Sequence, residues 1–306
     1  MSHAIIIPIY CENRNTINLC NELQNFGAEH IVVVNDGLNP KSEYFNELTS
    51  IGCHLVHLKN NNGKGASLKA GIKYAHDNLY NITGYITCDA DGQHTANDVM
   101  KISRMLDLRN GSLILGKRDY KKSKMPINIR IGNRLSSAYF KVITGKSCRD
   151  TQTGLRGIPA FLYDTVMKTK GSRFDFEMNF LTKCADMRVP FYFVNIIADC
   201  SNCSSNFRLI KDTYLIYRTP LRFATASIGC TIIDLVLFTI FAYILPSHMF
   251  FNIMLATLMA RVVSGGINFL INRKVIFGNT DNGAKQALRF FILFFCIMCA
   301  SSLIVS

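Results

Sequence analysis

The chain of 306 residues contains no tryptophan and only 21 acidic residues against 34 Lys and Arg. Cys200 and Cys203 form a Cys-x-x-Cys pair without nearby histidines, so the 11 cysteines are interpreted as free thiols. The net charge of +13 comes without aromatic residues interleaved among basic ones, which argues against a nucleic-acid partner. No basic leader precedes the short apolar run Ala4–Ile7, so we expect no signal peptide. These absences favour a basic protein whose front part lies in the cytosol beside an anionic membrane face.

The composition changes part-way along the chain. Up to about Tyr217 the sequence mixes charged and apolar residues, whereas from Phe223 onward Phe, Ile, Leu, Met and small residues dominate. A chain of this length has room for two domains. We therefore predict a soluble α/β domain followed by an all-α transmembrane domain.

Short apolar runs alternate with helical patterns in the front part, which predicts a Rossmann-like, mostly parallel sheet. The expected strands are Ala4–Tyr10, His30–Asn35, His54–Leu58, Gly84–Cys88 and Ser112–Gly116. The expected helices between them are Asn15–Phe26, Ala66–Asn78, Ala96–Leu108 and Ile131–Ile143.

Polar residues follow four of these strands, at the edge where such sheets bind ligands. Each one alone is better explained as a turn residue or a helix cap. Four strand ends that all carry such residues indicate a binding site. The residues are Tyr10, Glu12, Asp36, Asp89, Asp91 and Arg118.

The most specific of these features is Asp89-Ala90-Asp91-Gly92-Gln93-His94, directly after a buried strand. Two carboxylates one residue apart on a short turn can hold a hard divalent cation, which in turn holds a diphosphate. The loop Asn60–Gly65 precedes a helix but lacks the GxxxxGK[ST] spacing of a P-loop. It is interpreted as a Gly-rich turn that brings Lys64 near a nucleotide.

Five motifs occur in the order typical of one enzyme family, and together they span roughly Ala4 to Phe223. They resemble the GT-A inverting glycosyltransferases related to dolichyl-phosphate mannose synthase and the bactoprenol glucosyltransferases. The motifs are Ile7-Pro8-Ile9-Tyr10-Cys11-Glu12, Val34-Asn35-Asp36-Gly37, Asn62-Gly63-Lys64-Gly65-Ala66, the Asp89–His94 turn, and Asp150-Thr151-Gln152-Thr153-Gly154-Leu155-Arg156.

The resemblance implies a role for each matching residue. Pro8, Tyr10, Glu12 and Asp36 would surround the nucleoside of a nucleotide-sugar donor. Asp89, Asp91 and Gln93 would hold Mg²⁺ or Mn²⁺ and the diphosphate. Arg118, Arg130 and Arg208 would bind the phosphate of a polyprenyl or dolichyl phosphate acceptor, and Asp150 and Gln152 would line the sugar pocket. The lysines at 117, 121, 122 and 124 belong either to that site or to a loop that faces solvent or lipid headgroups.

The reaction implied is inverting transfer of a single hexose from a UDP- or GDP-sugar to the lipid phosphate. Such an acceptor is largely anionic near neutral pH, with a second pKa of about 6, so it needs little help from a general base. A processive polysaccharide synthase would carry a QxxRW motif, which a chain without tryptophan cannot have. A non-catalytic scaffold or glycolipid-translocating protein would not need the two aspartates. Whether the protein forms a homo-oligomer stays open.

Three apolar segments follow, each about 19 to 24 residues long and sufficient to span a bilayer. They are Phe223–Leu245, Met249–Asn272 and Ala287–Val305. Lys and Arg flank the first segment and fill the link between the second and third, whereas Pro246-Ser247-His248 has none. The positive-inside rule then predicts a multi-pass membrane protein whose catalytic domain is cytoplasmic.

This region resembles the GtrA-type membrane domain at 223–229 and 261–277. Such domains have four spans, so either a fourth is absent or the sequence is part of a longer chain. The expected organisation is a GT-A domain at 1–205, a juxtamembrane interface helix at 206–221 and the membrane domain at 222–306.

Asp234 and Arg261 interrupt the first two apolar segments. Each lies about twelve residues from a basic residue at the inner boundary, or roughly 18 Å at a rise of ~1.5 Å per residue. Because an unpaired charge at that depth is costly, we expect the two side chains to face each other. The alternative is two separately hydrated charges.

Overall fold

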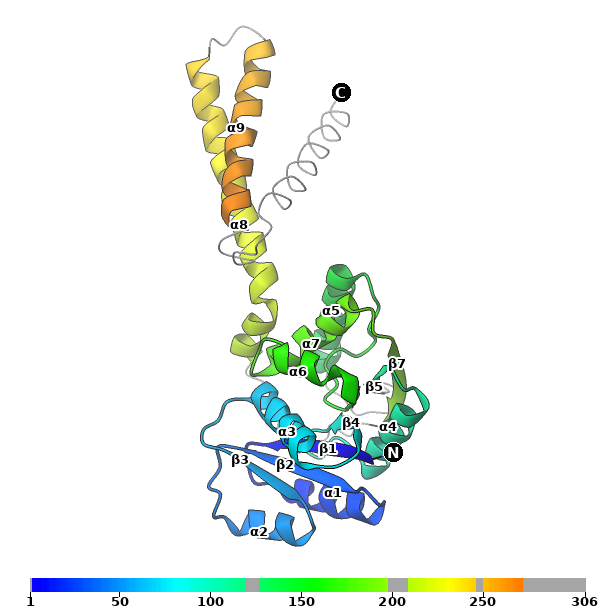
Figure 1. Ribbon diagram of the computed structural model, residues 1–306. Helices are drawn as coiled ribbons and strands as arrows, with labels where there is room; N and C mark the ends of the chain where they lie inside the picture. The colour runs from blue at the N-terminus through cyan, green and yellow to red at the C-terminus, as the bar shows by residue number, and fades with distance from the viewer. Residues whose placement is uncertain (1, 119–126, 198–208, 246–249, 272–306) are drawn as a thin grey trace. The chain divides into compact units, whose positions relative to one another are not determined.

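The computed structural model describes residues 2–118, 127–197, 209–245 and 250–271, and the chain divides into two compact units, residues 1–215 and 216–306 (Figure 1). The predicted borders at residues 205 and 221 stay predictions. The elements of the first unit are β1 (Ser2–Ile9), α1 (Arg14–Asn25), β2 (His30–Asp36), α2 (Glu43–Ser50), β3 (His54–Leu58), α3 (Lys64–Asn78), β4 (Ile82–Thr87), α4 (Ala96–Leu108), β5 (Leu113–Arg118), α5 (Ile127–Thr144), β6 (Arg156–Pro159), a 3-10 turn (Ala160–Leu162), α6 (Tyr163–Lys168), α7 (Phe174–Asp186) and β7 (Phe191–Ile196).

The strands form one seven-stranded sheet in the order β3-β2-β1-β4-β6-β5-β7. All neighbours are parallel except β6, which runs antiparallel to β4 and β5. The predicted Rossmann-like, mostly parallel sheet is confirmed. The sequence patterns missed β6, β7, α2, α6 and α7. The strand predicted at Ser112–Gly116 also ends too early. In the structure β5 pairs with β7 as far as Arg118, which lies opposite Ile196.

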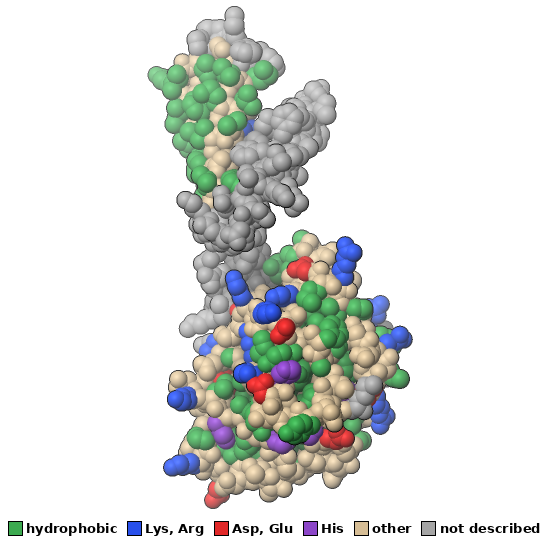
Figure 2. All heavy atoms as spheres, in the orientation of Figure 1, with side chains coloured by type: hydrophobic (Ala, Val, Ile, Leu, Met, Phe, Trp, Pro, Cys, Tyr) green, Lys and Arg blue, Asp and Glu red, His purple; other side chains and the backbone are tan. Residues whose placement is uncertain are grey.

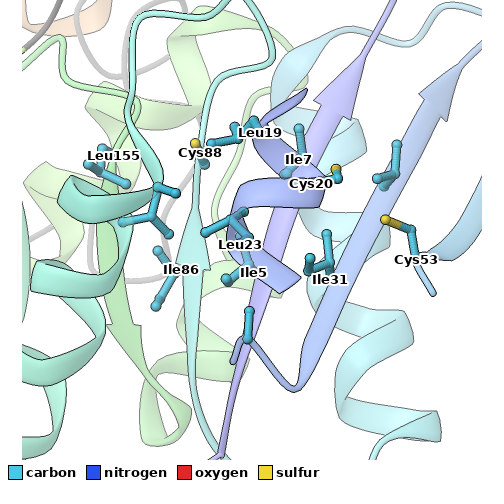
Figure 3. Packing of buried hydrophobic residues seen from close by; sticks show 14 of the residues in the cluster. Ile5, Ile7, Leu19, Cys20, Leu23, Ile31, Cys53, Ile86, Cys88 and Leu155 are labelled. Atoms are coloured by element: carbon cyan, nitrogen blue, oxygen red, sulfur yellow. The ribbon is translucent and has the colours of Figure 1, made fainter. Parts of the chain in front are cut away.

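Alternating residues of β1 are buried against different helices, as a strand covered on both faces requires. Ile5, Ile7 and Ile9 belong to the main hydrophobic cluster, together with residues of α1, α2, β2 and β4 (Figure 3). From α1, Leu23 enters this cluster and is fully buried.

The opposite face of the sheet is covered by α3. A Cβ added at Gly71 would lie 2.5 Å from Cγ2 of Ile6 and 2.7 Å from Cγ2 of Val34. This close approach brings the first residue of α3 to the carboxyl edge of β1 and β4. The N-terminus of α3 is thereby placed beside the predicted site.

The second unit contains α8 (Leu209–Ile244), which begins before the unit border, and α9 (Phe250–Ile271). By length and composition, Thr225–Ile244 and Asn252–Ile271 are apolar enough to cross a membrane, and only 6% and 22% of their residues are buried. Figure 2 shows mostly hydrophobic side chains on the surface of this helix pair. The predicted third segment lies outside the described residues.

Small side chains of α9 lie at every fourth position and are buried. They are Ala256, Ala260 and Ser264, a spacing that lets helix backbones approach closely in lipid. Ser264 donates a hydrogen bond from Oγ to Oδ1 of Asp234 on α8 at 2.7 Å.

The predicted pairing of Asp234 with Arg261 is wrong within the described part of the chain, where no ion pair joins them. The number of residues from the helix end predicts how deep a side chain lies in the membrane. The direction in which it points around the helix axis depends instead on how the helices pack. A serine hydroxyl thus meets the carboxylate in place of the guanidinium.

His3 joins the start of β1 to α4 through two polar contacts. Nδ1 of His3 lies 2.8 Å from Oγ of Ser103, and Nε2 lies 3.4 Å from Oδ1 of Asp107. Burial lowers the pKa of His3 below its ordinary value of 6.5, although Asp107 pulls it upward.

This burial predicts a pH-dependent loosening of β1. Just below pH 6.5 the unfolded chain binds more protons at His3 than the folded chain does, so the stability that the neutral ring contributes is lost as pH falls. We expect β1 and α4 peptides to exchange amide hydrogens faster at pH 5.5 than at 7.5, after correction for intrinsic rates, and His3→Gln to reduce that difference. An unchanged difference in His3→Gln would contradict the assignment.

Loss of the Ser264 hydroxyl should weaken the α8–α9 pair. In Ser264→Ala the Asp234 carboxylate loses a donor in an apolar setting, at a cost of about 0.5–1.5 kcal/mol. We expect a lower midpoint of thermal unfolding in detergent, followed by circular dichroism. Thr257→Ala is the control, because that hydroxyl donates to Ile253 of its own helix; equal losses in both variants would argue against the interhelical bond.

Candidate active site

Three contacts hold the turn after β4. Oγ1 of Thr87, the last residue of β4, donates to the carbonyl of Gly154 at 2.7 Å. Oγ1 of Thr16 on α1 donates to the carbonyl of Ala90 at 3.0 Å. Gly92 adopts a φ of +86°, and a Cβ there would press on the side chain of Asn15. The turn that carries the two aspartates is therefore fixed by side chains and packing from α1 and from the segment before β6.

Lys64, the first residue of α3, bridges the half-buried carboxylate of Asp89 and the buried carboxylate of Glu177. Its Nζ lies 2.6 Å from Oδ1 of Asp89 and 3.1 Å from Oε1 of Glu177 on α7. Burial disfavours the ammonium charge, but Asp89 and Glu177 outweigh it and raise the pKa of Lys64.

Asp89 is ionised for the same reason. Burial alone would raise its pKa, yet Lys64 and the His94 ring, with Nε2 at 3.8 Å from Oδ2, hold the pKa well below its usual range. Gly154 packs so closely on this carboxylate that a Cβ would overlap it. The Asp89 side chain is thus confined by packing as well as by charge.

Asp91 has a different environment. The backbone N–H of Gln93 donates to its Oδ1 at 3.1 Å, and the Gln93 side-chain amide donates to its Oδ2. Burial and the negative charge of Asp89 raise the pKa of Asp91. A cation at this half-buried carboxylate would relieve that repulsion, and carboxylate and amide oxygens are ligands that hard divalent cations prefer. Asp91 and Gln93 therefore fit a metal site.

Protein ligands alone would fill only part of such a site. No cluster of three or more His, Cys, Asp and Glu that could hold a metal occurs among the described residues. Mg²⁺ and similar ions commonly bind through one or two carboxylates plus substrate phosphates and water. The donor set therefore suits a cation that arrives with a phosphate ligand.

Asp36, expected beside the nucleoside, is buried and holds the loop that leads to Lys64. Its two oxygens accept hydrogen bonds from the backbone N–H groups of Asn62 at 2.8 Å and Gly63 at 2.9 Å. Gly63 has a φ of +94°, and a Cβ there would meet the side chain of Arg173. Asp36 thus fixes the position from which Lys64 extends.

Arg118 and Asp150 form a buried bidentate pair. Nε and Nη2 of Arg118 each donate to one Asp150 oxygen at 2.8 Å, and the Arg118 backbone N–H lies 3.3 Å from Oδ2. Because β6 is antiparallel, the segment that precedes it begins at the carboxyl edge of the parallel strands. Gln152 of that segment is half-buried near Gly132 on α5.

The remaining predicted residues occupy several positions. Pro8 is buried in β1, Tyr10 is half-buried, and Glu12 and Arg130 are exposed. Among the residues that the structure describes, no hydrogen bond or ion pair joins Glu12 or Arg130 to the Lys64–Asp89 group. Arg208 and the lysines at 121, 122 and 124 lie outside the described residues.

Two charged residues of the site were missed or given no role. Glu177 lies in the stretch Phe174–Leu181, where two acids, Asp175 and Glu177, alternate with phenylalanines and only the structure shows that Glu177 is the buried one. Arg156, quoted only as part of a motif, is buried and donates to the carbonyls of Thr153 at 2.9 Å and Glu177 at 3.0 Å. It ties the segment before β6 to α7.

Comparison with known families identifies the class. The model for glycosyl transferase family 2 matches residues 4–164, and that for the GtrA/DPMS transmembrane domain matches 222–306. The chain therefore belongs to glycosyl transferase family 2, and it combines a GT-A catalytic domain with a GtrA-type membrane domain. The resemblance predicted from the motifs is confirmed.

Three relatives are similar to part of the chain. An uncharacterized protein of Methanocaldococcus jannaschii is 32% identical over 188 residues, which cover 58% of this chain and 73% of the relative. UDP-N-acetylglucosamine--dolichyl-phosphate N-acetylglucosaminyltransferase of Methanococcus voltae is 29% identical over 172 residues, or 50% of this chain and 67% of the relative. Glycosyltransferase AglJ of Haloferax volcanii is 26% identical over 188 residues, which cover 60% of this chain and 58% of the relative.

A solved structure has the same fold. Glucosyl-3-phosphoglycerate synthase from Mycobacterium tuberculosis, crystallised with Mn²⁺, uridine diphosphate and phosphoglyceric acid, superposes with a TM-score of 0.54. It is 11% identical, and the match covers 72% of this chain and 76% of that one. At this identity the likeness establishes the fold alone.

The packing of Gly154 on Asp89 predicts a specific intolerance. Gly154→Ala would force its Cβ into the Asp89 carboxylate and should destabilise the protein by about 1–3 kcal/mol. Gly132→Ala is the matched control, because a Cβ there meets Gln152 only at 3.8 Å and alanine favours the helix by up to about 1 kcal/mol. Thermal unfolding should separate the two variants; a neutral Gly154→Ala would contradict the packing.

Proposed function

We propose that the protein transfers a single hexose from a UDP- or GDP-sugar to a polyprenyl or dolichyl monophosphate at the cytoplasmic face of a membrane, with inversion of the anomeric centre. One observation carries the proposal. A half-buried ammonium and two aspartates gather at the carboxyl edge of a GT-A sheet in a chain that also carries a GtrA-type membrane domain; they are Lys64, Asp89 and Asp91.

The charges of the site support a nucleoside diphosphate as part of the donor. Asp91 and Gln93 would hold Mg²⁺ or Mn²⁺, which would offset the negative charge of the departing diphosphate. Lys64 pairs with Asp89, two residues before Asp91, and its ammonium is a point charge suited to phosphate oxygens. Pro8, Tyr10, Glu12 and Asp36 surround the nucleoside in this proposal, with Asp36 acting through the loop it holds.

The exposed surface of α5 supports a lipid acceptor. Ile131, Leu135 and Val142 are exposed by 51%, 63% and 83%, and Arg130 and Arg134 lie on the same helix. Apolar and basic side chains on one exposed helix are typical of segments that lie at an anionic membrane interface. The relative from Methanococcus voltae is named for a dolichyl-phosphate acceptor.

In the proposed reaction the acceptor phosphate oxygen attacks the anomeric carbon while the bond to the diphosphate oxygen breaks. Arg130 and Arg208 would bind the acceptor phosphate with Arg118, whose guanidinium is oriented by Asp150. Asp150 and Gln152 would lie near the sugar. Since the attacking oxygen is already anionic, no side chain has to remove a proton from it.

Replacing Asp91 separates the enzyme from a non-catalytic scaffold. Asp91→Ala should retain its fold and lose at least about 100-fold in transfer, by analogy with the 10- to 100-fold cost of removing supporting groups around metals. The assay supplies radiolabelled UDP- and GDP-sugars to polyprenyl phosphate in detergent, with and without Mg²⁺ or Mn²⁺. Asp164→Ala, at an exposed acid whose Oδ2 lies 3.9 Å from Lys168, is the control.

Full transfer by Asp91→Ala would contradict the mechanism. No transfer by the wild type with any donor would favour the scaffold, and a polymeric product would favour a processive synthase.

A further inference from the structure

The two carboxylates around Lys64 come from different parts of the fold. Asp89 belongs to the turn after β4, whereas Glu177 belongs to α7. The two contacts are ion pairs, with Nζ of Lys64 2.6 Å from Asp89 and 3.1 Å from Glu177, and an ammonium has three N–H groups. A third N–H is sufficient to reach a phosphate oxygen without loss of either ion pair.

Glu177 is the more deeply buried of the two acids, and Arg156 holds its backbone. The residue is 7% exposed, and Nη1 of Arg156 donates to its backbone carbonyl at 3.0 Å. Nη2 of Arg156 lies 3.9 Å from Oε1 of its side chain. Arg156 itself is 2% exposed and also donates to Thr151 and Thr153. Glu177 is therefore held through its backbone, and its buried carboxylate faces two cations, Lys64 and Arg156.

Asp89 stands at the strand edge where the proposed donor would enter, so an arriving phosphate would repel its carboxylate. A lysine held by Asp89 alone would depend on that carboxylate for its position. A second anchor on α7 keeps Nζ in place irrespective of what Asp89 contacts. The lysine stem also lies near the Phe174 ring, with Nζ 5.8 Å from the ring centre.

We propose that Glu177 is a positioning residue that holds the Lys64 ammonium where the donor's diphosphate binds. The proposal rests on the proposed function, because it assigns the donor's diphosphate to Lys64. Glu177 itself touches neither donor nor acceptor. It acts through Lys64, so its contribution to donor binding should vanish when Lys64 is absent.

The test is a double-mutant cycle on the full-length protein in detergent. Calorimetric titration with UDP and with GDP, each with Mn²⁺, measures binding to the wild type, Glu177→Gln, Lys64→Met and the double variant. We expect Glu177→Gln to weaken binding roughly 10- to 100-fold, as for loss of a hydrogen bond to a charged group. The double variant should bind like Lys64→Met. Asp186→Asn, an exposed acid at the end of the same helix, should stay within about twofold of the wild type.

A transfer assay adds a second readout. Glu177→Gln should raise KM for the donor and leave KM for the lipid phosphate unchanged. Additive losses in the cycle, or unchanged binding by Glu177→Gln, would overturn the inference while the wild type still transfers sugar. If Glu177→Gln does not fold, the comparison of Lys64→Met with the double variant still decides, since a further loss in the double variant contradicts action through Lys64. A wild type that binds neither nucleotide would overturn the proposed function as well.

Discussion

One half-buried cation connects the parts of the catalytic unit that meet at the site. The Lys64 ammonium joins the start of α3 to the turn after β4 and to α7 through Asp89 and Glu177. Burial of either carboxylate without a partner would cost several kcal/mol or shift its pKa until it became neutral. The lysine thus keeps two negative charges in place at the strand edge. Its own position in turn depends on the loop that Asp36 holds by two backbone hydrogen bonds.

The site is built in two layers of polar contacts. The outer layer consists of side chains that bind backbone groups. Asp36 binds the loop before α3, Thr16 binds the turn after β4, and Arg156 binds the segment before β6. The inner layer consists of charged pairs, Lys64 with Asp89 and Arg118 with Asp150. Because the outer layer fixes the backbone, the inner charges meet without having to order flexible segments, which is the condition for electrostatic preorganisation.

Much of this arrangement could be predicted from the sequence, because apolar periodicity defines strands and parallel strands end at one edge. In the structure Asp36 ends β2, Arg118 ends β5, and Asp89 and Asp91 follow β4, so the strand ends lie where the pattern indicated. The function of Asp36 as a loop anchor could not be predicted, since a carboxylate at a strand end looks the same whether it accepts from backbone or from a ligand. Glu177 was missed because its partner Lys64 is more than 100 positions earlier, and only the packing of α7 brings them together. In the membrane unit, the Asp234 partner depended on helix rotation, which hydropathy does not report.

The state of the carboxylates bears on which acceptor the site can serve. A general base must hold a lone pair that is available to a proton, yet Asp89 is paired with Lys64 and has a lowered pKa. Asp36 accepts from two backbone groups, and Asp150 accepts from both nitrogens of an Arg118 fork. Asp91 has the raised pKa, but a cation there would remove its basicity. A site whose acids are neutralised in this way is poorly suited to deprotonate a sugar hydroxyl. It is well suited to an acceptor that arrives ionised, as a lipid monophosphate does.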